Sequence, residues 1–294
     1  LNPDLILSGD TLPEFDQVEK LIDDAVLTIG SSSAIFACGA ARLGMKVAFI
    51  GRVGQDLFGE FMLRALQSYG IDTRGVIVDT SLKTGVSVIL KRGADRAILT
   101  YPGSVASLRL ANIPPTILAQ SRHLHLASYF LQTSLMADVP ALFELAHSLG
   151  LTVSLDTNYD PGGQWDSGVA AALRQADIFF PNQTELLKLA RQSNLEQALD
   201  WAAQQVRTTV VKLGEGGGLV RQEAETHRAQ SVAIDVVDTV GAGDTFDAGF
   251  VYGYLSGWTP DRSLRMATIT GALSARKVGG VDAQPTLQEA LKYF

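Results

Sequence analysis

The residues best suited to chemistry lie in the stretch DTVGAGDTFDAGF, residues 238–250. Gly241, Ala242 and Gly243 have little or no side chain, so their backbone N–H groups can converge on an anion, and the helix expected after them adds its positive dipole end. Asp244 beside such an anion hole could take the proton from a hydroxyl group that attacks a phosphoryl group. A glycine-rich turn in which the aspartate caps the helix explains the same pattern, and the residues alone do not separate the two interpretations.

Two other segments could bind a ligand, although each also has an ordinary structural explanation. In GSSSAIFACGAARLG, residues 30–44, Gly30 and the serines offer close backbone approach and hydroxyl donors, but a serine N-cap on a tightly packed helix is the simpler interpretation. In PNQTEL, residues 181–186, an amide and a carboxylate lie three residues apart after an expected strand, where they could hold a hydrated Mg²⁺. The alternative is that Asn182 caps the next helix and Glu185 completes a capping box.

Several other patterns carry little functional weight. The stretch VKLGEGGGLV, residues 211–220, could let a nucleotide lie against a glycine turn, but a hairpin turn is the simpler interpretation. His123 and His125 share a face of an expected strand, yet no third metal ligand is evident. The sequence has no P-loop, protein-kinase or α/β-hydrolase motif, and its glycines do not match a dinucleotide-binding fingerprint.

Composition limits the function further. The 294 residues are 46% hydrophobic, enough for a sizeable core, and the formal net charge of −7 comes from intermixed charges, which argues against nucleic-acid binding. The single cysteine, Cys38, cannot form an internal disulfide, which fits a reducing cytoplasm. No uncharged apolar stretch has the length of a membrane helix, and we expect neither membrane insertion nor export.

Short apolar runs alternate with helical patterns, which predicts an α/β fold with a mainly parallel central sheet flanked by helices. The clearest expected strands are 46–51, 121–127, 151–156, 177–182 and 208–214, and the expected helices include 34–43, 59–69, 140–149, 195–206 and 245–255. Residues 84–103 break this rhythm, because two strand-like runs flank a RGADR turn. We expect this hairpin to be an appendage of one domain that spans residues 1–294.

Taken in order, these segments resemble the ribokinase-like, or PfkB, family of carbohydrate kinases. The resemblance covers nearly the whole chain and is carried by the ARLG helix, FIGRVGQDLFGE at 49–60, DTNYDP at 156–161, PNQTEL, VKLGEGG and DTVGAGDTFDAGF. It implies a ribokinase-like fold with a small β lid, formed by about 4–12 and 84–103, and transfer of the γ-phosphoryl group of ATP to a hydroxyl of a small sugar. It also allows a homodimer that pairs through the lids.

The resemblance gives the phosphate-binding residues their roles. Asp244 resembles the family's catalytic base, and the small residues 241–243 resemble its anion hole. Asn182 and Glu185 match the motif that arranges Mg²⁺ and phosphates, so Glu185 would act on the metal indirectly. The reaction would thus use Mg²⁺ together with ATP.

The resemblance also implies where the two substrates bind. Lys212, Gly214 and Gly217 fall on the turn that lines the nucleotide site in the family. Asn2 and Asp4 resemble the pair that grips sugar hydroxyls, which agrees with the ability of a carboxylate to bind two neighbouring hydroxyl groups.

Two further assignments concern the lid and a monovalent cation. Gly30 and Ser31 stand where the family usually has a Gly-Gly pair that lets the lid close. Asp238 and the Val240 carbonyl stand where some members bind K⁺. The resemblance therefore extends to K⁺ as a cofactor that this chain could use.

Three departures from the family pattern bear on the substrate. Ser31 replaces the second glycine, Ile35 stands where many members have a sugar-binding Asn, and Asp160 stands where Arg is frequent. Loss of that cation favours a neutral sugar or a nucleoside over an acidic or phosphorylated acceptor. The family's first strand is not found before Asn2, and we expect the sequence to be incomplete at its start. Two alternatives stay open: a nucleoside kinase of the same fold, and a sugar- or nucleotide-binding regulator without turnover.

Overall fold

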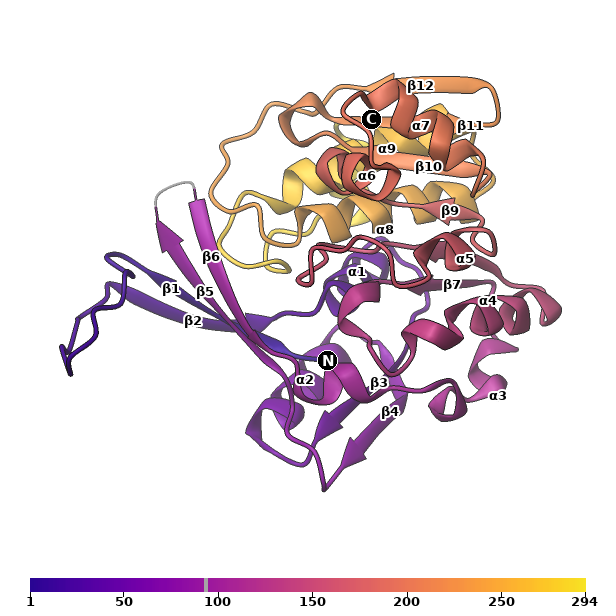
Figure 1. Cartoon of the computed structure of the whole chain (residues 1–294). Coiled ribbons are helices and arrows are strands. Elements are labelled where there is room, and N and C mark those ends of the chain that lie inside the picture. The colour runs from indigo at the N-terminus through magenta and orange to yellow at the C-terminus, as the bar shows by residue number, and fades with distance from the viewer. Residues whose placement is uncertain (93–94) are drawn as a thin grey trace.

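The computed structural model describes residues 1–92 and 95–294, and the described strands form three sheets (Figure 1). The large sheet has the strand order β12-β11-β10-β9-β8-β7, the small sheet has the order β2-β1-β5-β6, and β3 pairs with β4. The strands are β1 Pro3–Ser8, β2 Asp24–Ile29, β3 Ala48–Gly54, β4 Asp72–Asp79, β5 Val86–Arg92, β6 Asp95–Tyr101, β7 His123–Leu126, β8 Thr152–Leu155, β9 Ile178–Phe179, β10 Thr208–Lys212, β11 Gly218–Gln222 and β12 Glu225–Ala229. The α-helices are α1 Ser32–Arg42, α2 Leu57–Ser68, α3 Pro115–Leu118, α4 Val139–Ser148, α5 Val169–Leu173, α6 Gln183–Ala190, α7 Leu195–Ala203, α8 Ala242–Leu255, α9 Pro260–Ser274 and α10 Leu287–Leu291.

The large sheet is mainly parallel, as the sequence predicts. Strands β7, β8, β9 and β10 pair in parallel, and β11 and β12 continue the sheet as antiparallel strands. Successive side chains of a strand point to opposite faces, so Phe179 and Val211 pack with α4 to α7, whereas Phe180 and Val210 pack with α1, α8 and α9. The sheet is therefore covered by helices on both faces, and none of the described helices is long and apolar enough to cross a membrane.

The small sheet projects away from this core (Figure 1). Its strands β5 and β6 form the predicted hairpin, although the centre of the RGADR turn, residues 93 and 94, lies outside the described residues. Strand β1 pairs in parallel with β5 and in antiparallel with β2. The sequence analysis misses β2, whose outer residues are exposed and whose apolar side chains do not alternate cleanly with polar ones.

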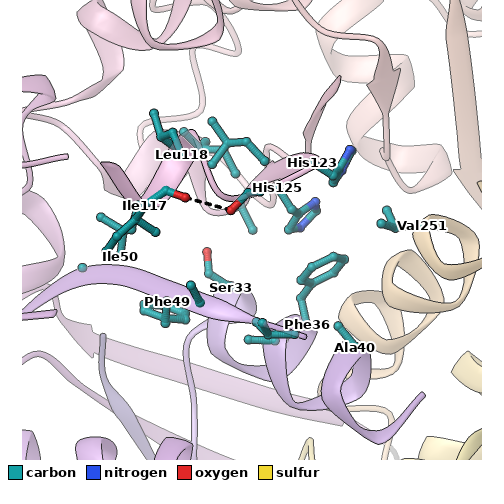
Figure 2. Close-up of a pocket in the computed structure, with 18 of the residues that line it drawn as sticks. Ser33, Phe36, Ala40, Phe49, Ile50, Ile117, Leu118, His123, His125 and Val251 are labelled. Atoms are coloured by element: carbon teal, nitrogen blue, oxygen red, sulfur yellow. Dashed lines mark hydrogen bonds between the residues drawn. The ribbon is translucent and has the colours of Figure 1, made fainter. Parts of the chain in front are cut away.

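A cavity of about 700 Å³ separates β3 from β7 (Figure 2). Among the predicted site residues only Ser31 lines it, so this cavity is not the site of the predicted chemistry. On its wall the Phe36 ring stacks on His125 with 3.8 Å between ring centres. Burial lowers the pKa of His123 to about 4 and that of His125 to about 3, so both histidines are neutral at pH 7. Neighbouring hydroxyl groups hold both rings, those of Thr152 and Ser154 for His123 and that of Ser154 for His125, which agrees with a structural role.

Candidate active site

The loop before α8 enters the helix through a glycine N-cap, and Ala242 N donates a long hydrogen bond to Thr239 O at 3.3 Å. Gly241 has a φ of 71° and caps α8 without a side-chain acceptor, so no capping side chain covers the first N–H groups of the helix. A Cβ at Gly241 would lie 2.7 Å from Gly280 Cα and 2.8 Å from Ile35 Cγ2, so both conformation and space require glycine. Gly241, Ala242 and Gly243 thus lie at the positive end of a helix that has no capping side chain, a position that suits an anion.

Asp244 is the third residue of α8 and not its N-cap, so the capping alternative is wrong. The residue is 8% exposed. Burial, reinforced by the charge of Asp156, raises the pKa of Asp244 to about 7, although Lys212 and the Ser32 hydroxyl oppose the shift. A carboxyl group with this pKa can exchange a proton near neutral pH, which is what a general base requires.

Asn182 and Glu185 form a capping box at the start of α6. Asn182 Oδ1 accepts a hydrogen bond from Glu185 N at 2.9 Å, and Glu185 Oε2 accepts one from Asn182 N at 2.8 Å. The structural explanation is therefore confirmed, and the box uses only one of the two carboxylate oxygens. Burial and the charge of Asp156 raise the pKa of Glu185 to about 7, so a cation placed beside this group would favour its ionised form.

The side chain of Lys212, the last residue of β10, ends in a buried acidic cluster that the sequence analysis misses. Its Nζ lies 2.7 Å from Asp156 Oδ2 and 3.2 Å from Asp247 Oδ2. A Cβ at Gly243 would lie 3.4 Å from Lys212 Cδ, so the lysine stem runs beside the anion hole. Two signals could have found the partners: Asp156 directly follows the strand β8, and Asp247 lies three residues after Asp244 on the same helix.

The turn after β10 is a hairpin turn, as the simpler interpretation of residues 211–220 predicts. Leu213 N donates a hydrogen bond to Gly217 O at 3.0 Å, and β11 then pairs in antiparallel with β10. Gly217 has a φ of 81°, and a Cβ there would lie 2.1 Å from Ala229 O. Gly214 has a φ of 58°, but a Cβ there would meet no atom within 4 Å. Packing therefore requires glycine at 217, whereas only the backbone conformation favours it at 214.

Asn2 directly precedes β1, and Asp4 is the second residue of this strand of the small sheet. Asn2 Nδ2 donates hydrogen bonds to Ser87 Oγ at 3.1 Å and to Asp4 Oδ1 at 3.3 Å. Gly30 makes room for this carboxyl group, because a Cβ at Gly30 would lie 2.0 Å from Asp4 Oδ1. Burial raises the pKa of Asp4 to about 7, against the effects of Ser87 and Arg96. The structure thus brings together Asn2, Asp4 and Gly30, three of the residues predicted to bind the acceptor sugar.

The acceptor-side residues also bear on the candidate base. The charge of Asp4 is a minor cause of the raised pKa of Asp244. Ser31 joins them through α1: it is the N-cap residue, its φ of 64° is one that glycine adopts more easily, and its side chain makes no capping hydrogen bond. The simpler interpretation is therefore confirmed in that a serine is the N-cap of a tightly packed helix, although only the Ser31 carbonyl, and not its side chain, accepts hydrogen bonds there, from residues 34 and 35.

Asp238 is held by backbone groups and faces two cations of the small sheet. Its Oδ1 accepts a hydrogen bond from Val240 N at 3.1 Å, and its Oδ2 accepts one from Gly279 N at 3.1 Å. Lys91 Nζ lies 3.6 Å from Oδ2, and the Arg96 guanidinium lies 4.0 Å from Oδ1. Because these cations already balance the carboxylate, the arrangement does not fit an added K⁺.

Asp160, which replaces a frequent arginine, stabilises a turn in this chain. Its Oδ1 accepts a hydrogen bond from Gly162 N at 2.8 Å, and its Oδ2 accepts one from Trp165 N at 2.7 Å. Both oxygens therefore have a structural use, and the position supplies neither a cation nor a free carboxylate to a substrate.

The described residues include no group of three His, Cys, Asp or Glu side chains placed to hold a metal ion. This does not conflict with Mg²⁺, which keeps several waters and commonly takes one or two carboxylates together with substrate phosphates. Glu185, which is buried and feels the charge of Asp156, could serve as such a single carboxylate for Mg²⁺.

Comparison with known proteins identifies the family. The model of the family described as pfkB family carbohydrate kinase matches residues 15–287. The chain belongs to this family. Members of the pfkB family are phosphotransferases with an alcohol group as acceptor, so the predicted family and class of enzyme are confirmed.

Relatives and solved structures agree with this placement of the pfkB-family chain. A 5-dehydro-2-deoxygluconokinase of Geobacillus thermodenitrificans is 30% identical over 283 residues, which cover 90% of this chain and 84% of that protein. An ATP-dependent ribose-1-phosphate kinase of Halopiger xanaduensis is 31% identical over 287 residues, covering 96% and 92%. The structure of a putative ribokinase II from E. coli in complex with ATP and Mg²⁺ superposes with a TM-score of 0.87 at 22% identity, covering 99% and 96%. The predicted ribokinase-like fold is therefore confirmed.

Proposed function

We propose that this pfkB-family chain is an ATP-dependent sugar kinase in which Asp244 accepts the proton of the acceptor hydroxyl. The observation that carries the proposal is the position of this buried carboxyl group on the first turn of α8, beside uncapped N–H groups. As the acceptor oxygen bonds to the γ-phosphorus, its proton passes to the carboxylate, and the bond between the γ-phosphorus and the ADP oxygen breaks. The N–H groups of 241–243 offset the negative charge that the transferring group carries.

The phosphates of ATP would be arranged by groups at the ends of β9 and β10. Glu185 would hold Mg²⁺ through water, and Asn182 would fix the orientation of Glu185 through the capping box. The bound Mg²⁺ would supply positive charge to the phosphates. Gly214 and Gly217 would line the nucleotide, and Lys212 would lie beside the phosphates as it does beside the anion hole.

The acceptor sugar would lie against Asn2, Asp4, Gly30 and Ser31. The paired amide of Asn2 and carboxyl group of Asp4 offer a donor and an acceptor to neighbouring hydroxyl groups. Asp160 supplies no cation, which favours a neutral acceptor. One relative is named a ribose-1-phosphate kinase, so phosphorylated acceptors belong in the test.

The small sheet would act as a lid over the acceptor. Ile6 of β1 and Ile89 of β5 pack against Val240, which directly precedes the anion hole, so a movement of the sheet would be transmitted to this loop. The lids of two copies would pair through exposed apolar side chains that share one face of the small sheet, namely Leu27, Leu99 and Tyr101. The cytoplasm stays the predicted location.

The test is ADP release from Mg·ATP over a panel of neutral sugars, sugar acids, sugar phosphates and nucleosides, with Asp244→Asn measured beside the unaltered chain. We expect release that depends on one class of acceptor and is lost in the variant. Release with nucleosides alone would favour the nucleoside kinase. ATP binding without ADP release for any acceptor would favour a regulator without turnover.

A further inference from the structure

Lys212 lies between two carboxyl groups that are both buried. The aspartates on either side of its Nζ, Asp156 at 2.7 Å and Asp247 at 3.2 Å, are 1% and 0% exposed. One ammonium group cannot balance two buried carboxylates, because like charges in one dry site strongly disfavour double ionisation. One of the two aspartates therefore keeps its proton.

The hydrogen bonds identify which aspartate it is. Asp156 Oδ1 accepts a hydrogen bond from Asn158 N at 2.9 Å, and its Oδ2 makes the shorter contact with Lys212. Asp247 Oδ1 is fully buried and has no hydrogen-bond partner among the described residues. A bare, buried carboxylate oxygen is unfavourable, whereas a carboxylic acid can donate its proton to a neighbouring carboxylate. The contacts favour an ionised Asp156 and a neutral Asp247.

The charges around the cluster agree with this assignment. Burial, together with the charge of Asp156, raises the pKa of Asp247 well above its usual value, against the effect of Lys212. Burial also acts on Asp156, but the Lys212 charge and the hydrogen bonds to this carboxylate outweigh it and keep its pKa below the usual value. The other titratable groups that act on the cluster are Glu185 from α6, Asp244 from α8 and His125 from β7.

We propose that Asp247 is a positioning residue that stays protonated during turnover, donates a hydrogen bond to Asp156 and thereby holds Lys212 beside the anion hole without adding negative charge. The inference rests on the proposed kinase function, because that function gives the anion hole its role. Lys212 Cδ would lie 3.4 Å from a Cβ at Gly243, so the position of the lysine and the shape of the anion hole depend on each other. An ionised Asp247, one turn from Asp244, would oppose ionisation of the base.

The kinetic test compares Asp247→Asn, which keeps a donor and the shape of the neutral acid, with Asp247→Leu, which removes the donor. We expect Asp247→Leu to lower kcat about tenfold or more and Asp247→Asn to restore it to within about threefold of the unaltered chain. The acid limb of kcat/KM should keep its apparent pKa in both variants, because no charge is removed. Asp4→Asn is the matched control: it removes a charge that raises the pKa of Asp244 but leaves the Lys212 cluster unchanged, so its acid limb should move to lower pH.

A second measurement is independent of turnover and of how well Asp247→Leu folds. Infrared spectra at about pH 8.5, where most carboxyl groups are ionised, should show the C=O band of a buried carboxylic acid that is missing from Asp247→Asn. Absence of this band, or an acid limb that moves in Asp247→Asn as it does in Asp4→Asn, would overturn the inference. If the band is present but no acceptor is phosphorylated, the proposed function fails and the protonation of Asp247 stands.

Discussion

The raised pKa of Asp244 predicts a steep acid limb in the pH dependence of the reaction. A carboxyl group at its ordinary value of 3.8 would be almost fully ionised at neutral pH, whereas the value of about 7 leaves about half of the molecules with an ionised base at pH 7 and about a tenth at pH 6. Only the ionised carboxylate can take a proton, so we expect kcat/KM for Mg·ATP to fall about tenfold for each pH unit below 7. The limb becomes steeper still if Asp4 and Glu185, whose pKa values are also about 7, must ionise as well.

Asp244→Asn separates the base from the surrounding structure. Loss of a general base typically lowers kcat about 10²- to 10⁴-fold, and the variant should have no acid limb from this residue. Its stability should move the other way. The pKa of Asp244 is higher in the folded chain than in the unfolded one. Protonation of Asp244 therefore stabilises the folded chain fully below about pH 4, and this stabilisation is lost as the pH rises through 7. The difference between 3.8 and about 7 converts to ~4 kcal/mol as an upper bound, so the variant should unfold at a higher temperature than the unaltered chain at pH 8 and at a similar one near pH 4.

The assays are initial rates of ADP formation from about pH 5 to 9 and thermal unfolding at about pH 4 and about pH 8. The reasoning is refuted by a kcat/KM of the unaltered chain that stays level down to about pH 5, or by near-normal turnover of Asp244→Asn. Asp4→Asn is the matched control, since it removes a charge that raises the pKa of Asp244 while leaving the base in place. Its acid limb should shift to lower pH but persist.

Two further predictions concern strain and cations. Ser31→Gly should raise the free energy of unfolding by about 1 kcal/mol, because Ser31 holds a φ of 64° that glycine adopts more easily. Ser33→Gly, inside the first turn of α1, should lower the free energy of unfolding by a similar amount. A denaturant titration in which both variants are less stable than the unaltered chain would contradict the assignment of strain. Replacing K⁺ by tetramethylammonium should change kcat less than about twofold, because Lys91 and Arg96 already face Asp238. Strong activation by K⁺ would show that these side chains give way to the ion.

The sequence predicts best where one local pattern has one structural solution. The small residues of 241–243 precede an amphipathic run, and the structure places them at the start of α8. The motif at Asn182 and Glu185 allowed two interpretations, and the capping box shows that the structural one is correct without excluding a role at the metal. One side chain oxygen can serve the helix while the other remains for a ligand, so such alternatives do not compete.

The sequence predicts poorly where the meaning of a residue depends on a distant partner. Lys212 lies on the predicted turn, but its ammonium is directed by Asp156 and Asp247, which are 56 and 35 residues away. No local pattern signals these ion pairs of Lys212, because they form only when the ends of β8 and β10 meet α8 in the folded chain. The same reason explains the missed strand β2: it is ordered by pairing with β1, and its own alternation is weak.

The site contains more carboxyl groups than cations, and this excess explains how a carboxylate can lie at an anion hole. Burial is the first cause of the raised pKa of Asp4, Glu185 and Asp244, each to about 7, so at neutral pH these groups are partly protonated and do not jointly repel a phosphate. A cation beside Glu185 would favour its ionised form, and an acceptor hydroxyl that donates to Asp4 would do the same there. Binding of the substrates is thus linked to proton release, and the negative charge of the site develops only as positive and donor groups arrive to balance it.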